Sequence, residues 1–344
     1  MSFIKYFFFG AFLSGLAIVS FVSGGFWCLR ETLAFVPQVA QPFEITITKG
    51  MQTRQIAGLL KGTNIISSAI VFSYWIRLNG ADSRLRPGVY KFQGNESLDE
   101  ILKILLEGRE ENVKFTIPEG LTLKMIAGTL EKNGICSETA FLESVSSRDL
   151  LGKVFAGWGE IPNPEGLPFP ETYVFHKGVN PGEIAETMLL MTKNTVEKVC
   201  LNSRFSDLSL YQKCILASIV ERECKLKEER PLVASVFLNR LKKGMKLESC
   251  ATVQYALPEH KERLTYDDLK VISPFNTYQN SGLPPTPISN FGKAAVEAVA
   301  SPAENDFLFF VSNASEGHRF GKTLKEHEHN KKLFFEDRNR LETH

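Results

Sequence analysis

The longest apolar pattern in the chain lies near its start. Residues 6–29 contain no charged side chain and are rich in Phe, Leu, Ile, Val and Gly. About 20 apolar residues in a helix span the hydrocarbon core of a bilayer. Trp27 lies near the far end of this segment, at the depth where interfacial Trp is common. A cleaved signal peptide has a shorter apolar core. The pattern therefore favours an uncleaved signal anchor, with a buried helix of a soluble domain as the alternative.

The residues around this segment predict how the start of the chain is divided. Residues 1–5 form a short cytoplasmic tail, and residues 30–42 form a Pro-containing linker. Lys5 and Arg30 nearly balance under the positive-inside rule, so charge alone does not decide the orientation. We expect a single-pass protein of the cytoplasmic (inner) membrane, with the bulk of the chain on the extracytoplasmic, periplasmic side.

A duplicated pattern follows the linker. Residues 43–48 alternate apolar and polar side chains, as a strand does, and a helical pattern begins after a Lys-Gly turn. The same order returns from residue 113 onward. The motif Ile-Ala-Gly-x-Leu occupies residues 56–60 in the first copy and 126–130 in the second. Two copies are too few for a solenoid, but they predict a repeated strand–helix–helix unit.

The first copy predicts a small subdomain. Ser67 and Ser137 are the predicted N-caps of the second helix in the two copies. Residues 86–92 add a turn and a closing strand to the first copy. The order strand–helix–helix–strand resembles the LysM fold, which is a glycan-binding module. We predict a LysM-like βααβ subdomain at residues 43–110; a packing subdomain without a ligand is the alternative.

The remainder predicts an α+β catalytic domain at residues 113–344. Residues 113–200 contain the second copy, a long loop rich in Pro and Gly, and a helix from Pro181 to Cys200. Residues 201–344 form the expected catalytic core. Its predicted parts are a helix with a Ser209–Gln212 capping box, a helix after Pro231, polar and aromatic loops, a strand pair and a charged closing helix, at residues 209–223, 231–243, 273–288, 307–323 and 325–341.

Charge and cysteine content narrow the possible partners. The 344 residues carry 40 basic and 39 acidic side chains, so the chain lacks the basic surplus of a nucleic-acid-binding protein. None of the six cysteines shows a CxxC spacing. His327 and His329 lie two residues apart and point to different faces of a helix, which argues against a metal site with His318. We expect no metal, no cofactor and no nucleic acid.

A candidate catalytic acid follows an apolar run. Residues 216–220 are apolar apart from one serine, and Glu221 comes next. Burial raises the pKa of a carboxyl group, and a general acid working at neutral pH needs a raised pKa. The alternative is an ordinary helix end with solvated or ion-paired glutamates.

Glu223 lies two residues further along the same predicted helix. Side chains at this spacing diverge by about 200°, so the two glutamates cannot form the facing carboxylate pair of an ordinary glycosidase. A single acid suits a lytic mechanism, in which the sugar's own 6-hydroxyl attacks the anomeric carbon. Glu223 would then pair with Arg222 or Arg230, or hold the frame of the active site.

Short motifs follow one another in order along most of the chain. They are Phe169-Pro170-Glu171-Thr172-Tyr173, Ala217-Ser218-Ile219-Val220-Glu221-Arg222-Glu223, Glu229-Arg230-Pro231, Val236-Phe237-x-Asn239-Arg240-Leu241, Thr252-Val253-x-Tyr255, Ser273-Pro274-Phe275-Asn276-Thr277-Tyr278, Gly282-Leu283-Pro284-Pro285 and Lys322-Thr323-Leu324-x-Glu326-His327. Together they resemble the YceG-like (MltG) endolytic murein transglycosylase family. The resemblance implies a membrane-anchored lyase that cuts nascent peptidoglycan glycan strands internally, leaves 1,6-anhydro-N-acetylmuramic acid ends and works beside cell-wall synthases.

The resemblance also implies site residues, with Glu221 as the catalytic acid. We predict that polar and aromatic residues of the motifs bind substrate: Glu171, Tyr173, Glu223, Arg230, Asn239, Arg240, Thr252, Tyr255, Asn276, Thr277 and Tyr278. The family usually has Asp-Pro before Thr252, where this chain has Cys250-Ala251. Two alternatives are a non-catalytic, membrane-anchored glycan-binding scaffold for cell-wall enzymes and an anchored structural protein without glycan affinity.

Overall fold

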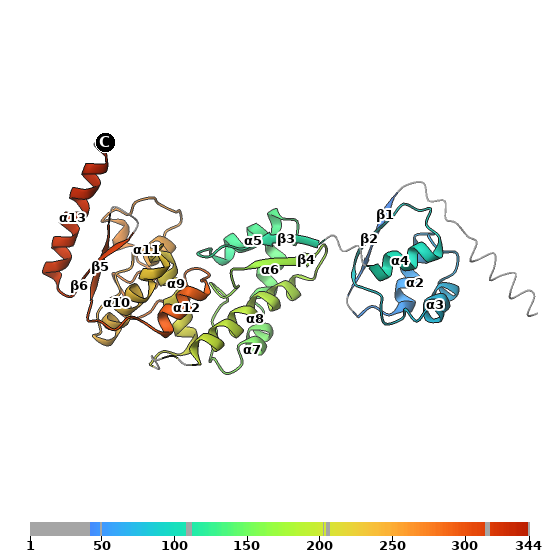
Figure 1. Ribbon diagram of the computed structural model, residues 1–344, viewed down its shortest axis with the longest axis horizontal. Helices are drawn as coiled ribbons and strands as arrows, with labels where there is room; N and C mark the ends of the chain where they lie inside the picture. Colours follow the sequence, from blue (N-terminus) through green and yellow to red (C-terminus); the bar gives the residue numbers. More distant parts are fainter. Residues whose placement is uncertain are drawn as a thin grey trace, which may run out of the picture. The chain divides into compact units, whose positions relative to one another are not determined.

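Helices make up most of the chain, and its strands pair only two by two. The computed structural model describes residues 42–48, 50–107, 112–201, 203, 207–313 and 317–342. Among these residues there are three two-stranded sheets, so the predicted α+β class is confirmed. The chain divides into two units (Figure 1). The first contains the described residues up to Val113 together with His176–Gly178, and the second contains the rest.

The predicted anchor at residues 6–29 lies outside the described residues, as do the tail and nearly all of the linker. Within the described ranges, every helix is too short or too polar to cross a bilayer. The anchor therefore stays a prediction.

A two-stranded sheet and three helices form the first unit. The chain runs through β1 (Phe43–Ile47), α2 (Thr53–Gly62), α3 (Ala69–Leu78), β2 (Gly88–Phe92) and α4 (Leu98–Glu107). Strands β1 and β2 are antiparallel, and the predicted element order strand–helix–helix–strand is confirmed. Its LysM-like character and its binding of glycan stay predictions.

The core of the first unit follows from the sequence periodicities. Alternation in β1 buries Ile45 and Ile47. Each helix buries one face, which includes Leu60 on α2 and Phe72 on α3. Full burial stabilises an aliphatic or Phe side chain by about 1.5–3 kcal/mol relative to exposure. The sheet and the helices therefore hold each other in place.

The duplicated motif ends two helices in the same way. Asn64 after α2 has φ 59° and Gly134 after α5 (Leu123–Lys132) has φ 68°, both in the left-handed region. The next amide in each copy donates back to a carbonyl of the last helical turn: Ile65 to Leu60 at 3.2 Å and Ile135 to Leu130 at 3.0 Å. This is the Schellman pattern, which satisfies the otherwise unpaired helix carbonyls. The two copies of the motif therefore share the same cap at the C-terminal end of their first helix.

One of the two predicted N-caps is displaced by a residue. Ser137 caps α6 (Glu138–Val145) as predicted, with its side chain accepting from the Ala140 amide. In the first copy, however, Ser68 rather than Ser67 caps α3, because the Ser68 hydroxyl accepts from the amide of Val71. The predicted N-cap Ser67 is therefore wrong.

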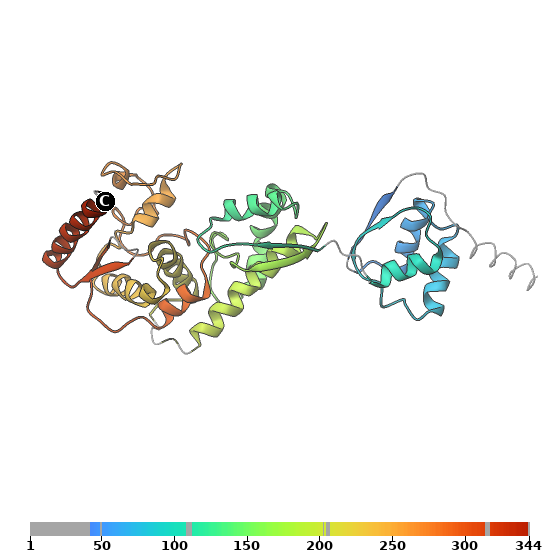
Figure 2. The same ribbon diagram turned by 45° about the horizontal axis from the view of Figure 1, so that its top comes forward.

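The second unit is organised around α9 (Leu210–Glu223). Helices α8 (Pro181–Cys200), α10 (Arg230–Lys242), α11 (Cys250–Ala256) and α12 (Lys293–Ala300) all pack against it (Figure 2). Every side chain from Cys214 to Val220 is buried. The predicted helix and its Ser209–Gln212 capping box are confirmed. A helix covered on most sides needs no polar face, which explains the unbroken apolar run.

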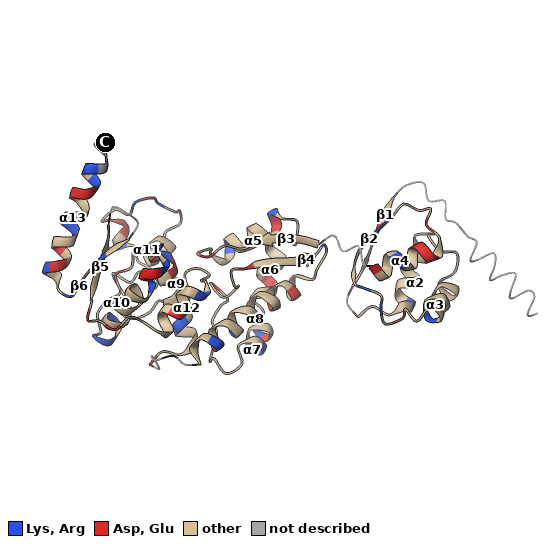
Figure 3. Ribbon diagram, viewed as in Figure 1, with Lys and Arg blue, Asp and Glu red and all other residues tan. Residues whose placement is uncertain are grey.

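Two further sheets belong wholly or mostly to the second unit. Strand β3 (Asn112–Thr116) pairs with β4 (Thr172–His176), and β5 (Phe309–Ser312) pairs antiparallel with β6 (His318–Gly321). Helix α13 (Leu324–Glu342) packs on β5 and β6 and carries charges of both signs along its length (Figure 3). The pair β5–β6 and α13 were predicted. The prediction missed β4, α11, α12 and the short α7 (Arg148–Val154).

Two positions on α3 test the core of the first unit. Phe72 is 0% exposed and Tyr74 is 65% exposed. Phe72→Ala should lower the free energy of unfolding of this unit by about 3–5 kcal/mol, because it leaves a cavity. Tyr74→Ala should change it by less than about 0.5 kcal/mol. Hydrogen exchange of the α2 and α3 amides measures this stability separately from that of the second unit. Equal protection in the two variants would contradict the packing.

Candidate active site

Helix α9 ends in two glutamates that lie in different surroundings. The helix stops at Glu223, because Cys224 adopts an extended conformation. Since successive helical residues are about 100° apart, Glu221 and Glu223 point in nearly opposite directions. The side chain of Glu221 is 4% exposed.

Glu221 forms a buried ion pair with Arg230. The guanidinium donates from Nη2 to Oε1 at 2.5 Å and from Nη1 to Oε2 at 3.2 Å, and the Arg230 side chain is also 4% exposed. The amide of Gly292 donates to Oε2 at 3.0 Å. Arg230 begins α10 and Gly292 caps α12. The pair therefore joins the ends of three helices. Of the alternatives given for Glu223, a pair with Arg230 is therefore wrong.

A third charged side chain, Glu119, lies beside this pair. Its Oε2 is 3.8 Å from Nη2 of Arg230. Burial raises the pKa of Glu221, and the Glu119 carboxyl adds to the rise, while the Gly292 amide and the Arg230 guanidinium oppose it. The expected direction of the pKa shift is confirmed. Both oxygens of Glu221 nevertheless already have donors, so this carboxylate is not presented to a ligand.

Glu223 is held from one side only. Its Oε1 accepts from the Ser249 hydroxyl at 2.5 Å and from the Ala251 amide at 3.0 Å. Ser249 precedes α11 and Ala251 lies in its first turn, so the start of α11 positions the carboxylate. Within the part of the chain that the structure describes, no donor contacts Oε2. This oxygen is left for a ligand.

Glu223 borders a cavity of about 340 Å³. Its lining combines charged, aromatic, small polar and aliphatic side chains: Glu223, Arg240, Leu247, Glu248, Cys250, Tyr278, Phe310, Val311, Ser312, His327 and Lys331. Larger hollows near residues 146–162, near residues 270–280 and between residues 208–215 and 282–285 contain neither Glu221 nor Glu223. The cavity beside Glu223 is therefore the candidate active site.

Arg240 fixes one wall of this cavity. It donates from Nε to the Leu308 carbonyl at 2.6 Å and from Nη1 to Oε2 of Glu248 at 2.9 Å. Its guanidinium lies 5.1 Å from the centre of the Phe309 ring, which also stacks on His327. Burial, together with nearby cationic side chains, lowers the pKa of His327, so its ring is neutral at neutral pH. The wall offers aromatic faces and polar atoms, as sugar rings require.

Residues 45–333 of the chain match the YceG-like family. The chain belongs to the YceG-like family. The family predicted from the ordered motifs is thus confirmed.

Named relatives and a solved structure agree with this membership. A Bacillus subtilis (strain 168) protein named endolytic murein transglycosylase is 32% identical over 308 residues, which cover 86% of this chain and 85% of the relative. A Streptococcus pneumoniae (serotype 2, strain D39) protein of the same name is 26% identical over 89% of this chain and 61% of its own length. A crystal structure of a YceG-like protein from Listeria monocytogenes matches with a TM-score of 0.58 and 32% identity, covering 85% of this chain and 99% of that one.

Three of the predicted substrate-binding residues of this YceG-like chain line the cavity: Glu223, Arg240 and Tyr278. The Tyr278 hydroxyl lies 3.3 Å from Sγ of Cys250. Cys250, at a position where the family usually has Asp, therefore forms part of the cavity wall. These residues come from α9, α10, α11 and the loop after Asn276.

Other predicted residues hold loops together instead. Thr252 and Thr277 are 0% and 1% exposed, and their hydroxyls are 2.8 Å apart. The buried Asn276 side chain donates to two backbone carbonyls. The Asn239 side chain donates to two other backbone carbonyls. Arg230 is committed to Glu221. These residues support the site without lining its cavity, so their binding of substrate stays a prediction.

The remaining predicted residues have structural contacts of their own. The buried Tyr173 donates its hydroxyl to the Phe169 carbonyl at 2.8 Å. Tyr255 donates to Oε2 of Glu165 at 3.1 Å. Glu171 is exposed and accepts from the amide of its neighbour, Thr172. A direct role in binding stays a prediction for all three.

Sequence reasoning missed several residues in the cavity wall and behind it. Ser249, which lies outside the lining but orients Glu223, had a signal: it precedes a short helical segment, as N-cap residues do. His327 belonged to a motif but was considered only as a metal ligand. Glu248 adopts φ 51°, which is rare for a residue other than Gly, and no sequence pattern predicts this conformation.

The Pro- and Gly-rich loop before β4 contacts Tyr255 on α11 and the backbone of Ser289. Glu165 accepts from the Leu123 amide at 2.8 Å as well as from Tyr255, and its burial raises the pKa of its carboxyl group. Gly166 has φ 74°, and a Cβ there would lie 2.5 Å from the Ser289 carbonyl oxygen. Only Gly allows this close approach in a left-handed conformation.

Gly166→Ala should therefore lower the free energy of unfolding of the second unit by about 2–5 kcal/mol, from a left-handed residue and an overpacked contact. Gly157→Ala is the matched control, because Gly157 has φ 90° with no atom near its Cβ position. The control should cost only about 1–2 kcal/mol. Urea unfolding of both variants measures the difference, and equal losses would show that the close contact is absent.

Proposed function

We propose that this YceG-like chain is an endolytic peptidoglycan lytic transglycosylase. It would cut the bond between N-acetylmuramic acid and N-acetylglucosamine inside nascent glycan strands, which would end their elongation. One observation carries the catalytic assignment: the Glu223 carboxylate has one oxygen held by α11 and the other left for a ligand at a polar, aromatic cavity. The names of the Bacillus and Streptococcus relatives support the substrate class.

In the proposed reaction, protonated Glu223 gives its proton to the glycosidic oxygen as the bond from that oxygen to the anomeric carbon breaks. The 6-hydroxyl of the same N-acetylmuramic acid then attacks the anomeric carbon, and the Glu223 carboxylate takes the proton of that hydroxyl. The product is a 1,6-anhydro end, and no water is consumed. Ser249 and Ala251 hold Oε1, so Oε2 would carry the proton.

The family resemblance implied Glu221 as the general acid, but Glu223 fits this role better. A general acid must lie within hydrogen-bond reach of the atom that it protonates. Glu221 has a raised pKa but is enclosed by Arg230 and Gly292. The other carboxylate of the cavity, Glu248, is paired with Arg240. Glu223 is the carboxylate at this cavity that lacks a basic partner among the described residues.

Paired substitutions separate the two glutamates. Glu223→Gln should slow cleavage of uncrosslinked glycan strands by at least about 100-fold, because the proton donor is lost. Glu221→Gln should cut strands while it remains folded, but should lower the free energy of unfolding by about 3–5 kcal/mol, because Arg230 loses its buried counter-charge. Mass spectrometry of the digests measures cleavage, and circular dichroism confirms folding.

The reverse result would return the acid role to Glu221: a folded Glu221→Gln variant without activity and an active Glu223→Gln variant. The products also identify the reaction. Ends that are one water lighter than hydrolysis products indicate a lytic transglycosylase, whereas ordinary reducing ends indicate a hydrolase. If the wild-type chain binds strands without cutting them, it is the non-catalytic scaffold.

We further propose that residues 6–29 anchor the chain in the cytoplasmic membrane, beside the cell-wall synthases. The uncharged length of this segment and the extracytoplasmic location of peptidoglycan support this arrangement. The full chain should sediment with membranes and be digested by protease added to spheroplasts. A chain that starts at residue 30 is the control and should stay in the soluble fraction. Equal distribution of the two chains would argue against an anchor.

A further inference from the structure

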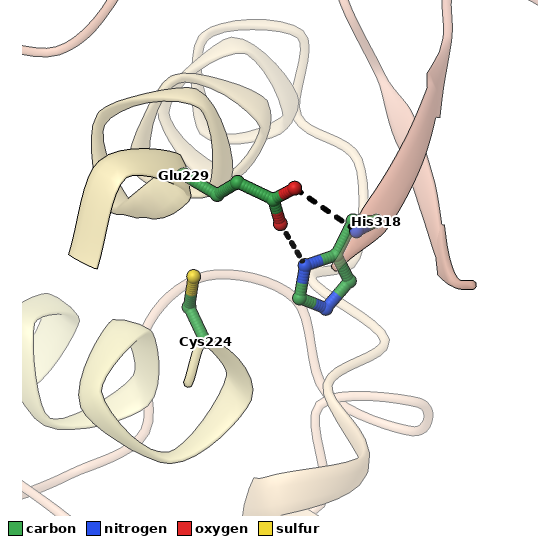
Figure 4. Close-up of side chains that lie close together, drawn as sticks. All are labelled: Cys224, Glu229 and His318. Carbon is green, nitrogen blue, oxygen red and sulfur yellow. Dashed lines mark hydrogen bonds and ion pairs between the residues drawn. The ribbon is translucent and has the colours of Figure 1, made fainter. Parts of the chain in front are cut away.

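Three side chains with metal-binding atoms converge behind the end of α9: Cys224, Glu229 and His318 (Figure 4). Their ligand atoms all lie within 4.8 Å of one another. None of the three lines the cavity of the proposed reaction. They form a cluster that the proposed catalytic function does not use.

The cluster joins three elements. Cys224 is the C-cap of α9, Glu229 ends the short 3₁₀ turn Lys227–Glu229, and His318 begins β6. Cys224 is 1% exposed, and the side chains of His318 and Glu229 are 5% and 21% exposed. The site is thus nearly closed, with access from the Glu229 side. Sequence spacing could not predict it, because His318 is 89 residues from Glu229.

Hydrogen bonds already orient the three side chains. Glu229 contacts His318 twice: Oε2 is 2.7 Å from the ring Nδ1, and Oε1 accepts from the backbone amide at 3.2 Å. The Cys224 thiol donates to the Leu226 carbonyl at 3.0 Å. Burial raises the pKa of this thiol to about 11, with a further contribution from the Glu229 charge. Without a cation the thiol stays protonated.

We propose that Cys224, Glu229 and His318 bind one Zn²⁺ ion. A thiolate, an imidazole and a carboxylate are the ligand types that zinc takes from proteins. Zinc bonds of about 2.0–2.3 Å would place tetrahedral ligand atoms roughly 3–4 Å apart. Side-chain rotations that move the ligand atoms by about 1 Å therefore bring them to bonding distance. The thiolate and carboxylate charges together balance the dication.

Binding balances in protons as well as in charge. The thiol releases its proton to solvent, and the imidazole carries its single proton on Nε2 so that Nδ1 is free to bind the metal. The ion replaces the hydrogen bond between Nδ1 and Glu229. It would brace the end of α9 against β6 and take no part in bond cleavage. Three protein ligands leave a fourth position for water. Because the cluster does not line the cavity, we assign the ion a bracing role.

The test uses the full chain, purified in detergent, stripped with a chelator and titrated with Zn²⁺ and, separately, with Co²⁺. Cys224→Ser is the main variant, because it removes one ligand and leaves the contact between Glu229 and His318. Cys136→Ser is the matched control, since this cysteine lies outside the cluster. Mass spectrometry of the metal content and isothermal titration give stoichiometry and affinity.

Wild type and Cys136→Ser should bind one equivalent of zinc, show thiolate-to-cobalt charge-transfer absorption and unfold at a higher temperature with zinc than without. Cys224→Ser should lose the absorption and the thermal shift, and its zinc affinity should fall by at least about 10–100-fold, the loss that follows even from changes outside the ligand set. His318→Gln provides a second ligand change with the same expected losses. The proposal is overturned if the wild type binds no zinc, or if Cys224→Ser binds it as tightly as the wild type. Glycan cleavage by wild type is measured in parallel, so failure of the metal site and failure of the proposed activity are distinguishable.

Discussion

The arrangement of the second unit depends on the buried ion pair between Glu221 and Arg230. Two opposite charges in a water-poor interior each carry a large desolvation cost, which only close contact and further hydrogen bonds offset. The bidentate contact and the Gly292 amide supply them. The pair therefore acts as a constraint on geometry: α9, α10 and α12 must end or begin at one point.

That constraint determines where Glu223 can be. The last turn of α9 cannot rotate while Glu221 is bonded to Arg230, so the residue two positions on must face the other side of the helix. There the start of α11 holds one of its oxygens through Ser249 and Ala251. The contacts of Glu221 fix the last turn of α9, and this turn fixes the direction of the Glu223 side chain. The proposed acid is thus positioned by the ion pair that its neighbour Glu221 forms with Arg230.

The fold was more predictable than the site. Local signals were enough for the capping box at Ser209 and the buried run of α9, because each depends on neighbours within a few residues. Helices α11 and α12 are short and lie among loops, so their periodicity was too brief to recognise. The distinction between Glu221 and Glu223 was out of reach for another reason. An apolar run identifies the buried glutamate, but the Ser249 contact that orients the other one links distant parts of the chain.

The cavity beside Glu223 draws its walls from widely separated parts of the chain, from α9 to His327 and Lys331 on α13. The cavity is therefore complete only when α13 has folded onto β5 and β6. Folding of α9 and its neighbouring helices alone leaves one wall missing, so the second unit has to form as a whole before the cavity exists.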